Sequence, residues 1–312
     1  MILQQTRVDQ GTAYYIRFIE LFQTVSDLAN AAEDVVLHAW QGLGYYSRAR
    51  NLHAAAKAIV NNHQGKFPNE YNAIRELKGI GDYTAAAIAS IAFNLPYAAV
   101  DGNVNRVIAR LFAIEEPVDS PKGKKIISEL AKELLDLQNP GRHNQAMMEL
   151  GALICAPRNP DCSHCPLQVH CSGFASKRQE HFPVKQSKTK VRDRFLTYLV
   201  FVDKQYETLI RKRASKDIWQ GLYEFPLIES DSQQNQESLF KANNETTNEK
   251  PMQYTHLLSH QRLHIQFIIN EVDMLPVSDW KDAIRLKIDE IDNYAMPRAI
   301  TRFLTNLKSF SV

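Results

Sequence analysis

All four cysteines of the chain fall within one short stretch, spaced as Cys155-x6-Cys162-x2-Cys165-x5-Cys171. Four thiolates that converge from one loop repel each other unless a metal neutralises them, so this spacing predicts a metal centre. Two disulfides in a secreted protein are the alternative, which the lack of an apolar signal segment at the N-terminus disfavours. The spacing by itself leaves a zinc ion and an iron–sulfur cluster open.

Size and charge set the next limits. A chain of 312 residues can form two domains, each with its own core. The formal net charge is only +2, so nucleic-acid binding would require local basic patches rather than a global positive field. No apolar run approaches the length needed to cross a bilayer, and we see no transit or lipidation signal, so we expect a cytoplasmic protein without membrane contact.

The first half of the chain, residues 1–171, has apolar residues at three- and four-residue spacing, which predicts an all-α domain. Gly, Pro and Asn separate the expected helices, which cover 34–40, 84–93, 104–114, 123–137 and 144–155. Residues 1–6 also resemble the interior of a helix. Between 172 and 193 the composition shifts to Lys, Arg, Gln and Ser, which predicts a basic linker that is either solvated or in contact with phosphate.

The second half, residues 194–312, contains runs of β-branched and aromatic residues at 195–202 and 265–272, with a further candidate at Leu209 and Ile210. These runs predict the strands of a mixed α/β domain. The polar segment 229–250 predicts a long surface loop or a poorly ordered insertion. The last helices are expected at 280–286 and 297–307.

Two short motifs in the first half could carry chemistry. Gly79 and Gly81 form a tight turn before an Ala-rich helix, where backbone N–H groups at the positive end of the helix dipole can bind a phosphate. An ordinary helix–turn–helix connection has the same pattern. About twenty residues later Asp101 begins another predicted helix, a position at which an Asp is usually only an N-cap.

The motifs Leu-x-Gly-x-Gly-x-Tyr-Thr-Ala and Asp-Gly-Asn-Val-x-Arg-Val, followed by the cysteine array, resemble the helix–hairpin–helix DNA glycosylases of the endonuclease III superfamily. Residues 1–6, 42–50 and 144–151 resemble the MutY-type adenine DNA glycosylases, which remove adenine mispaired with 8-oxoguanine. The resemblance implies an all-α helix–hairpin–helix domain with an iron–sulfur loop at 155–171, followed by an α/β Nudix-like domain. It also implies a [4Fe–4S] cluster on Cys155, Cys162, Cys165 and Cys171.

The chemistry implied by the resemblance needs a carboxylate beneath the deoxyribose and a proton donor for the leaving base, because the sugar becomes oxocarbenium-like. By resemblance Asp101 stabilises or captures the sugar cation, while Asn103 and Tyr83 position it. Bifunctional relatives carry a lysine at the position of Tyr83 to form a Schiff base, which a phenol cannot do. We therefore expect a monofunctional glycosylase rather than a glycosylase/lyase.

The resemblance also implies which residues contact DNA, from which the target adenine must be rotated out of the stack. Gln5 and Tyr45 match residues inserted beside the mispair, and Gln145 matches a residue near the adenine edge. Arg158 matches a basic residue that faces the DNA backbone. The N–H groups of the turn at Gly79 and Gly81 are the other expected contacts with the DNA backbone. The expected partner is double-stranded DNA with 8-oxoguanine:adenine or guanine:adenine mispairs, bound by a monomer.

In the second half, residues 217–226 resemble the Nudix-like domain that these glycosylases use to inspect 8-oxoguanine. A Nudix hydrolase needs a glutamate-rich helix for its metal ions, and no such array follows Pro226, so we expect recognition rather than hydrolysis. Leu258, Ser259 and His260 match the lesion-checking loop, although the family usually has an aromatic residue at the position of Leu258.

One expected residue is not in the printed chain. By resemblance the general acid is a glutamate two residues before Ile2, and Asp9, which is the first acidic residue, lies roughly two helical turns further on. We therefore expect an N-terminally truncated chain that excises adenine extremely slowly or not at all. Either the sequence starts at an internal methionine of a longer active product, or the protein is a non-catalytic, lesion-binding remnant.

Overall fold

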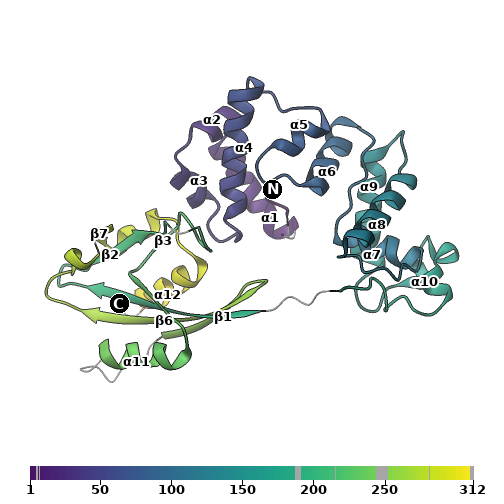
Figure 1. The fold of residues 1–312 in the computed structure, drawn as a ribbon. Coiled ribbons are helices and arrows are strands. Elements are labelled where there is room, and N and C mark those ends of the chain that lie inside the picture. The colour runs from purple at the N-terminus through teal and green to yellow at the C-terminus, as the bar shows by residue number, and fades with distance from the viewer. Residues whose placement is uncertain are drawn as a thin grey trace. The chain divides into compact units, whose positions relative to one another are not determined.

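The computed structural model describes residues 1–4, 6, 8–186, 191–214, 216–243, 252–280 and 282–309. The chain divides into two compact units (Figure 1). Unit 1 combines Met1–Val60 with Thr189–Val312, and unit 2 is Asn61–Lys188. These units are defined by contacts in space, and unit 1 joins both ends of the chain. They therefore do not test the predicted division along the sequence into 1–171, 172–193 and 194–312, which stays a prediction.

Unit 2 is helical. After α4 (Ser47–His63), which begins in unit 1, come α5 (Tyr71–Glu76), α6 (Asp82–Phe93), α7 (Gly102–Leu111), α8 (Pro121–Glu133) and α9 (Pro140–Glu149). Short turns follow in the cysteine loop: η1 (Leu150–Ile154), η2 (Cys162–His164), η3 (Gln168–His170) and α10 (Ser172–Ala175). The helices predicted over 84–93, 104–114 and 123–137 are confirmed with shifted ends. The one expected over 144–155 is α9, continued by the π-helical turn η1.

The segment after the cysteines packs onto unit 2. Phe182 is 1% exposed in a cluster with Val104, Ile108 and Ile127. The N–H of Val118 donates to the carbonyl of Val184 at 3.0 Å. Phe182 and the carbonyl of Val184 thus attach this segment to the rest of unit 2, whereas the basic side chains of Lys177, Arg178 and Lys185 are exposed. The basic linker over 172–193 stays a prediction.

Unit 1 contains two sheets. One has the order β4-β1-β6-β5, with β4 (Leu227–Ser230), β1 (Arg192–Val202), β6 (Gln261–Glu271) and β5 (Met252–Leu257). The other has the order β3-β2-β7, with β3 (Tyr223–Glu224), β2 (Glu207–Lys212) and β7 (Ala283–Lys287). The central strands β1 and β6 are parallel, with Leu196 opposite Ile265, and the other neighbouring strands are antiparallel. The strands predicted at 195–202, 209–210 and 265–272 are confirmed.

Two helices cover the faces of the four-stranded sheet (Figure 1). On one face lies α12 (Arg298–Ser309), whose Phe303 stacks on Phe267 of β6 at 4.0 Å between ring centroids. On the other lies α11 (Gln233–Asn243), whose buried Gln236 donates to the carbonyls of Leu196 and His264. The helix predicted over 297–307 is therefore confirmed.

Two predictions for the second half are wrong. The segment 229–250 contains the end of β4 and helix α11, which Ser232 caps by accepting from the N–H of Asn235. The helix has too few apolar residues to give a periodic signal, and residues 244–250 lie outside the described part. The expected helix at 280–286 contains strand β7, because residues 283–287 pair with β2 and place Leu286 opposite Thr208. Short 3₁₀ turns, η4 (Val277–Asp279) and η5 (Ile288–Asn293), flank it.

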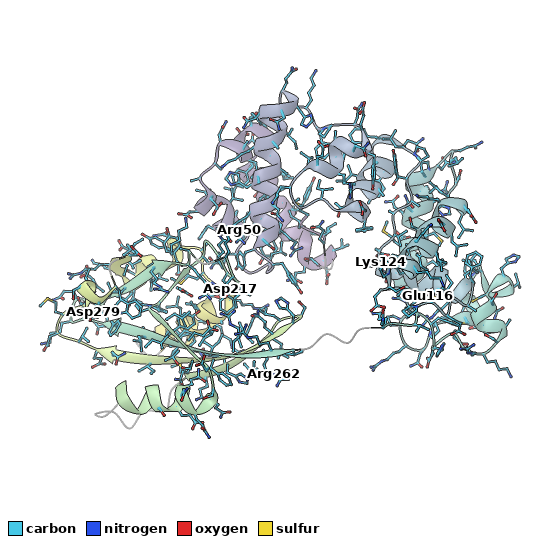
Figure 2. The ribbon with its side chains drawn as sticks, viewed as in Figure 1. Arg50, Glu116, Lys124, Asp217, Arg262 and Asp279 are labelled. Atoms are coloured by element: carbon cyan, nitrogen blue, oxygen red, sulfur yellow. The ribbon has the colours of Figure 1, made fainter. Side chains whose placement is uncertain are left out.

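The N-terminal helices of unit 1, α1 (Val8–Leu21), α2 (Val25–Asn30), α3 (Glu33–Ala39) and α4, pack against its C-terminal part. Trp40 and Leu37 are fully buried in a cluster that includes Leu222. Arg50, labelled in Figure 2, donates to the carbonyl of Gln220 at 2.5 Å. The helix expected over 1–6 is absent from the described residues there, which form turns whose carbonyls accept from Arg48 instead.

No helix in the described part of the chain combines the length and the apolar character that crossing a membrane requires.

The buried amide of Asn144 links α9 to the loop before α7, and its removal tests this packing. Asn144 accepts from the N–H of Ala99 at 3.0 Å and donates to Ser90 and to the carbonyl of Tyr97. Asn144→Ala leaves these groups without a partner, and we expect it to lower the free energy of unfolding by about 1–3 kcal/mol in chemical denaturation. The exposed control Asn62→Ala on α4 should change it by less than about 0.5 kcal/mol, and equal effects would contradict the assignment.

Candidate active site

The turn between α5 and α6 leads into a helix that has no side-chain cap. Gly79 has φ = +80°, a conformation that glycine adopts without strain, and the N-cap Gly81 makes no side-chain capping bond. A Cβ built on Gly81 would meet nothing within 4 Å, so the first turn of α6 is open. This geometry suits an anion at a helix N-terminus.

Asp101 is the N-cap of α7, as its position predicted, and its carboxylate is held by three hydrogen bonds. Oδ1 accepts from the N–H groups of Asn103 and Val104, both at 2.8 Å. Oδ2 accepts from the side-chain amide of Asn103 at 3.1 Å. The half-buried carboxylate is thereby fixed in one orientation.

Tyr83 lies in the first turn of α6, and its hydroxyl donates to the sulfur of Met148 at 3.4 Å. Burial, and then the negative charge of Asp101, raise the pKa of the Tyr83 phenol, so it stays protonated at neutral pH. Asp101, Asn103 and Tyr83 thus come together in unit 2, as the sequence motifs predicted.

Arg106 connects this group to the cysteine loop. Its guanidinium donates to the side-chain oxygen of Asn103 at 2.9 Å, to the carbonyl of Gly151 at 2.6 Å and to the carbonyl of Cys155 at 2.7 Å. A Cβ on Gly151 would lie 2.6 Å from the Cβ of Asn103, so only glycine permits this close packing. Arg106 was not among the residues predicted from sequence, although it lies within the Asp-Gly-Asn-Val-x-Arg-Val motif.

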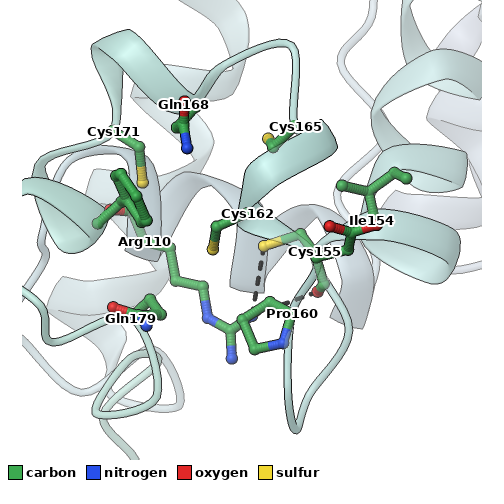
Figure 3. Close-up of a pocket in the computed structure, with 11 residues that line it drawn as sticks. Arg110, Ile154, Cys155, Pro160, Cys162, Cys165, Gln168, Cys171 and Gln179 are labelled. Atoms are coloured by element: carbon green, nitrogen blue, oxygen red, sulfur yellow. Dashed lines mark hydrogen bonds between the residues drawn. The ribbon is translucent and has the colours of Figure 1, made fainter.

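The four cysteines surround one hollow beside Arg110 (Figure 3). Arg110 is 2% exposed and donates to the sulfur of Cys155 at 3.3 Å. It also donates to the carbonyls of Ala156, Pro157 and Phe182. Burial, and then the neighbouring thiols, raise the pKa of the Cys162 thiol, so four thiolates here need added positive charge.

The geometry of the sulfurs bears on which metal they fit. All four cysteines are free thiols, and no three His, Cys, Asp or Glu side chains in the described residues are placed to hold a single metal ion. A zinc site draws its ligands onto one ion, whereas in a [4Fe–4S] cluster each thiolate binds a different iron and the sulfurs stay further apart. The four cysteines line one hollow, an arrangement that either kind of metal centre requires.

Two further predicted contacts in unit 2 are exposed. Arg158 lies in the loop between Cys155 and Cys162, next to Asn159, whose N–H donates to Glu180 at 3.0 Å. Gln145 lies on the exposed side of α9, one residue after the buried Asn144. Both are accessible to a ligand.

In unit 1, Tyr45 projects from a tight turn. Gly42 and Gly44 have φ of +94° and +78°, Tyr45 has φ = +49°, and half of the Tyr45 side chain is exposed. Arg48 lies over the rings of Tyr45 and Trp40, at 5.5 Å and 5.3 Å from their centroids. The guanidinium of Arg48 thus stabilises the turn through a cation–π contact with Tyr45.

Arg48 also holds the start of the chain. Its guanidinium donates to the carbonyls of Met1 and Ile2 at 3.2 Å and 3.1 Å, to the carbonyl of Gln4, and to the hydroxyl of Thr6. Because the same group donates to the carbonyl of Gly44 at 3.2 Å, it joins the first residues to the Tyr45 turn. Gln5, predicted to enter the DNA stack, lies outside the described residues.

The three residues Leu258, Ser259 and His260 form the loop between β5 and β6. The N–H of Leu258 donates to the carbonyl of Gln261 at 2.8 Å, and Leu258 packs on the core of the sheet. Ser259 and His260 are exposed, with 3.1 Å between the Ser259 hydroxyl and Nδ1 of His260. The lesion-checking loop predicted from sequence is therefore a hairpin tip.

This hairpin and the Tyr45 turn line a common hollow, which we call the Tyr45 hollow. Tyr45, Leu258 and Ser259 contribute to it, together with Trp219, His256 and Arg298, which the sequence analysis missed. His260 is not among its lining residues. Burial, and then the charge of Arg298, lower the pKa of His256, so its ring is neutral at pH 7.

Residues of the motif 217–226 form a closed ionic network. Glu224 is 1% exposed and accepts from Arg213 at 2.8 Å. Although burial opposes it, hydrogen bonds from Arg194 and Arg213 lower the pKa of Asp217 (labelled in Figure 2) to about 2. The carboxylates of Asp217 and Glu224 thus form ion pairs with Arg194 and Arg213.

The sequence matches two family models. The first, the HhH-GPD superfamily base excision DNA repair protein, covers residues 1–148, and the second, the NUDIX domain, covers residues 197–306. The fold class predicted from sequence is therefore confirmed: a helical HhH-GPD domain is followed by a mixed α/β NUDIX domain. The class of protein is a base excision DNA repair enzyme.

Comparison with known proteins narrows the class. An adenine DNA glycosylase of Buchnera aphidicola subsp. Acyrthosiphon pisum is 30% identical over 99% of this chain and 88% of the relative. Another, of Buchnera aphidicola subsp. Baizongia pistaciae, is 31% identical over 100% and 88%. A solved thermostable thymine-DNA glycosylase is 29% identical, with a TM-score of 0.52 over 56% of this chain and 81% of the other. The chain belongs to the adenine DNA glycosylase family.

Replacement of Arg106 tests the connection between Asn103 and the cysteine loop. Arg106→Gln cannot reach all three acceptors, so buried carbonyls lose their donor, and we expect the free energy of unfolding to fall by about 3 kcal/mol. Hydrogen exchange should become faster at residues 151–155 and at the start of α7. Arg142→Gln on the exposed side of α9 is the control, and the same exchange pattern in both variants would contradict this role.

Proposed function

We propose that this chain removes adenine paired with 8-oxoguanine or guanine by hydrolysing its N-glycosidic bond. The observation that carries the proposal is the carboxylate of Asp101, which Asn103 and the N-terminus of α7 hold in one orientation beside Tyr83. A fixed carboxylate beneath the sugar stabilises the positive charge that develops as the base leaves.

In this reaction the bond between the sugar C1′ and adenine N9 breaks and its electron pair leaves with the base. Asp101 stabilises or captures the sugar cation, and a water then supplies the hydroxyl at C1′. The Tyr83 phenol is protonated and is not an amine, which supports hydrolysis without Schiff-base chemistry. The leaving adenine still needs a proton from a general acid.

The Tyr45 hollow supports inspection of the opposite base. Tyr45 supplies an exposed aromatic ring for insertion beside the mispair, and Ser259 supplies a hydroxyl for a hydrogen bond to the oxidised base. Leu258 packs inward and supplies apolar contact only. In unit 2, the open N-terminus of α6 at Gly79 and Gly81, with Arg158 and Gln145, would contact the strand that carries the adenine.

We also propose a [4Fe–4S] cluster on the four cysteines, which are free thiols that line one hollow. When bound, the cluster neutralises the thiolates and holds the loop that contains Arg158. Arg110 donates to the sulfur of Cys155 and to three carbonyls of the loop and the packed segment, so it orients the ligands from within the protein.

Replacement of Asp101 tests the catalytic role. Asp101→Asn keeps the capping oxygen but removes the charge, so we expect the single-turnover rate of adenine release from an 8-oxoguanine:adenine duplex to fall about 10²–10⁴-fold. Binding of the duplex should persist, and Glu129→Gln on α8 should leave the rate unchanged. An unchanged rate in Asp101→Asn would refute the assignment, and borohydride trapping of wild type on DNA would refute the absence of a Schiff base.

The same assay separates the two candidate functions. Adenine release by the 312-residue chain supports the glycosylase, whereas lesion-dependent binding without base release would favour the non-catalytic alternative.

Removal of one ligand tests the cluster. In Cys165→Ala we expect the iron content and the visible absorbance to fall, together with the thermal stability of unit 2, whereas Ser163→Ala should retain both. Metal analysis of the wild type distinguishes the alternatives directly. One zinc per chain without iron would refute the cluster.

A further inference from the structure

A second hollow continues from the Tyr45 hollow along helix α12. It is lined by residues of β5 and α12, and it shares His256 and Arg298 with the first. Its other side chains include the hydroxyls of Thr255, Thr301 and Thr305 and the guanidinium of Arg302. Because the two hollows meet at these shared residues, they are continuous, and we call the second one the α12 groove.

The α12 groove is basic. Neither β5 nor α12 contains an Asp or a Glu. Within the described part of the chain Arg298 and Arg302 form no ion pair, whereas Arg194, Arg213 and Arg285 of the same unit all pair with carboxylates. The whole chain has a net charge of only +2, so this is a local concentration of positive charge.

The side chains of the groove are also held in place. The guanidinium of Arg302 lies 5.1 Å over the ring of Tyr254, and the hydroxyl of Tyr254 accepts from Asn306 at 2.8 Å. The ring is thereby fixed under the cation, whose N–H groups remain available for an anion. Two arginines one helical turn apart, about 6 Å along the axis, match the repeat of a polyanion better than a single small anion.

We propose that the α12 groove binds the sugar–phosphate backbone of the DNA strand whose base is inspected in the Tyr45 hollow, with Arg298 and Arg302 each contacting a phosphate. Guanidinium groups without neighbouring carboxylates are among the groups that contact phosphates in protein–DNA complexes. The hydroxyls of Thr301 and Thr305 donate to helix carbonyls, so the arginines are the main donors of the groove. The groove begins where Tyr45 and Ser259 end, so the strand that places a base in the hollow continues directly past α12. The proposal deepens the proposed function and rests on it.

A nucleoside diphosphate, the other phosphate-bearing class suggested by a NUDIX fold, is less well supported. Such substrates are normally bound through divalent metal ions held by carboxylates. The described residues contain no group of three or more His, Cys, Asp or Glu side chains placed for a metal ion. Among the described residues that line the groove there is no Asp or Glu. The experiment therefore uses DNA and includes the nucleotide as a competitor.

The test measures how the affinity for DNA depends on salt. The variants Arg298→Gln, Arg302→Gln and the double variant are compared with wild type on two duplexes, one with 8-oxoguanine opposite a non-hydrolysable adenosine analogue and one undamaged. Each lost phosphate contact should lower the slope of log Kd against log salt by about 0.9, and binding of both duplexes should weaken by the same factor. Lys204→Gln, which removes one positive charge from an exposed ion pair of unit 1, should keep the wild-type slope.

A second measurement identifies the strand. Single neutral methylphosphonates are placed along each strand, and each is tested with wild type and with Arg298→Gln. At one phosphate of the 8-oxoguanine strand, the methylphosphonate should weaken DNA binding by wild type. The same replacement should not weaken DNA binding by Arg298→Gln any further. Coupling only to phosphates of the adenine strand would overturn the strand assignment.

The remaining outcomes are distinct. A double variant with wild-type melting temperature and wild-type slope overturns the proposal, as does a loss confined to the 8-oxoguanine duplex, which would mean that the arginines read the base. Displacement of DNA by a nucleoside diphosphate at the groove would favour the other ligand class and overturn it as well. If wild type shows the expected slope but neither prefers the lesion nor releases adenine, the proposed function fails while the groove remains a backbone site.

Discussion

The buried guanidinium of Arg106 is the contact on which unit 2 depends. It joins the amide of Asn103, and through it the carboxylate of Asp101, to the carbonyls of Gly151 and Cys155. A buried charge is costly unless its donors are satisfied, so this arginine can occupy its place only when the cysteine loop is folded over it. The orientation of Asp101 and the path of the loop are therefore set together, and Arg110, one turn further along α7, holds the next residues of the same loop in the same way.

Unit 1 uses the same physical solution at a different place. Arg48 donates to the carbonyls of Met1 and Ile2 and to that of Gly44, and it supports the ring of Tyr45. In both units a nearly buried arginine replaces the regular backbone partners that irregular segments lack. Irregular segments can then carry exposed side chains, Tyr45 in one unit and Arg158 in the other, while arginines pair with the carbonyls of these segments.

Much of the architecture could be predicted from residue patterns. The two wrong predictions both lie where contacts with a strand distant in the sequence decided the structure. Helices α6, α7 and α12 have strong signals, such as the Asp101 cap and the apolar stripe of α12. Strand β7 was predicted as a helix, since a short run with apolar residues fits either period, and its pairing with the distant β2 decided the outcome. Helix α11 was missed because Gln236, not an apolar face, attaches it to the sheet.

The sequence by itself determined the chemistry of the individual residues. The cysteine spacing, the Asp-Gly-Asn motif and the glycine turn are local, and local sequence dictates caps, turns and ligand loops. Only the tertiary structure decided which distant segments meet: Arg106 with Cys155, the Tyr45 turn with the Ser259 hairpin, and β5 with α12. Such contacts depend on how buried surfaces and unpaired carbonyls are satisfied across the chain, and no residue's near neighbours in sequence contain that information.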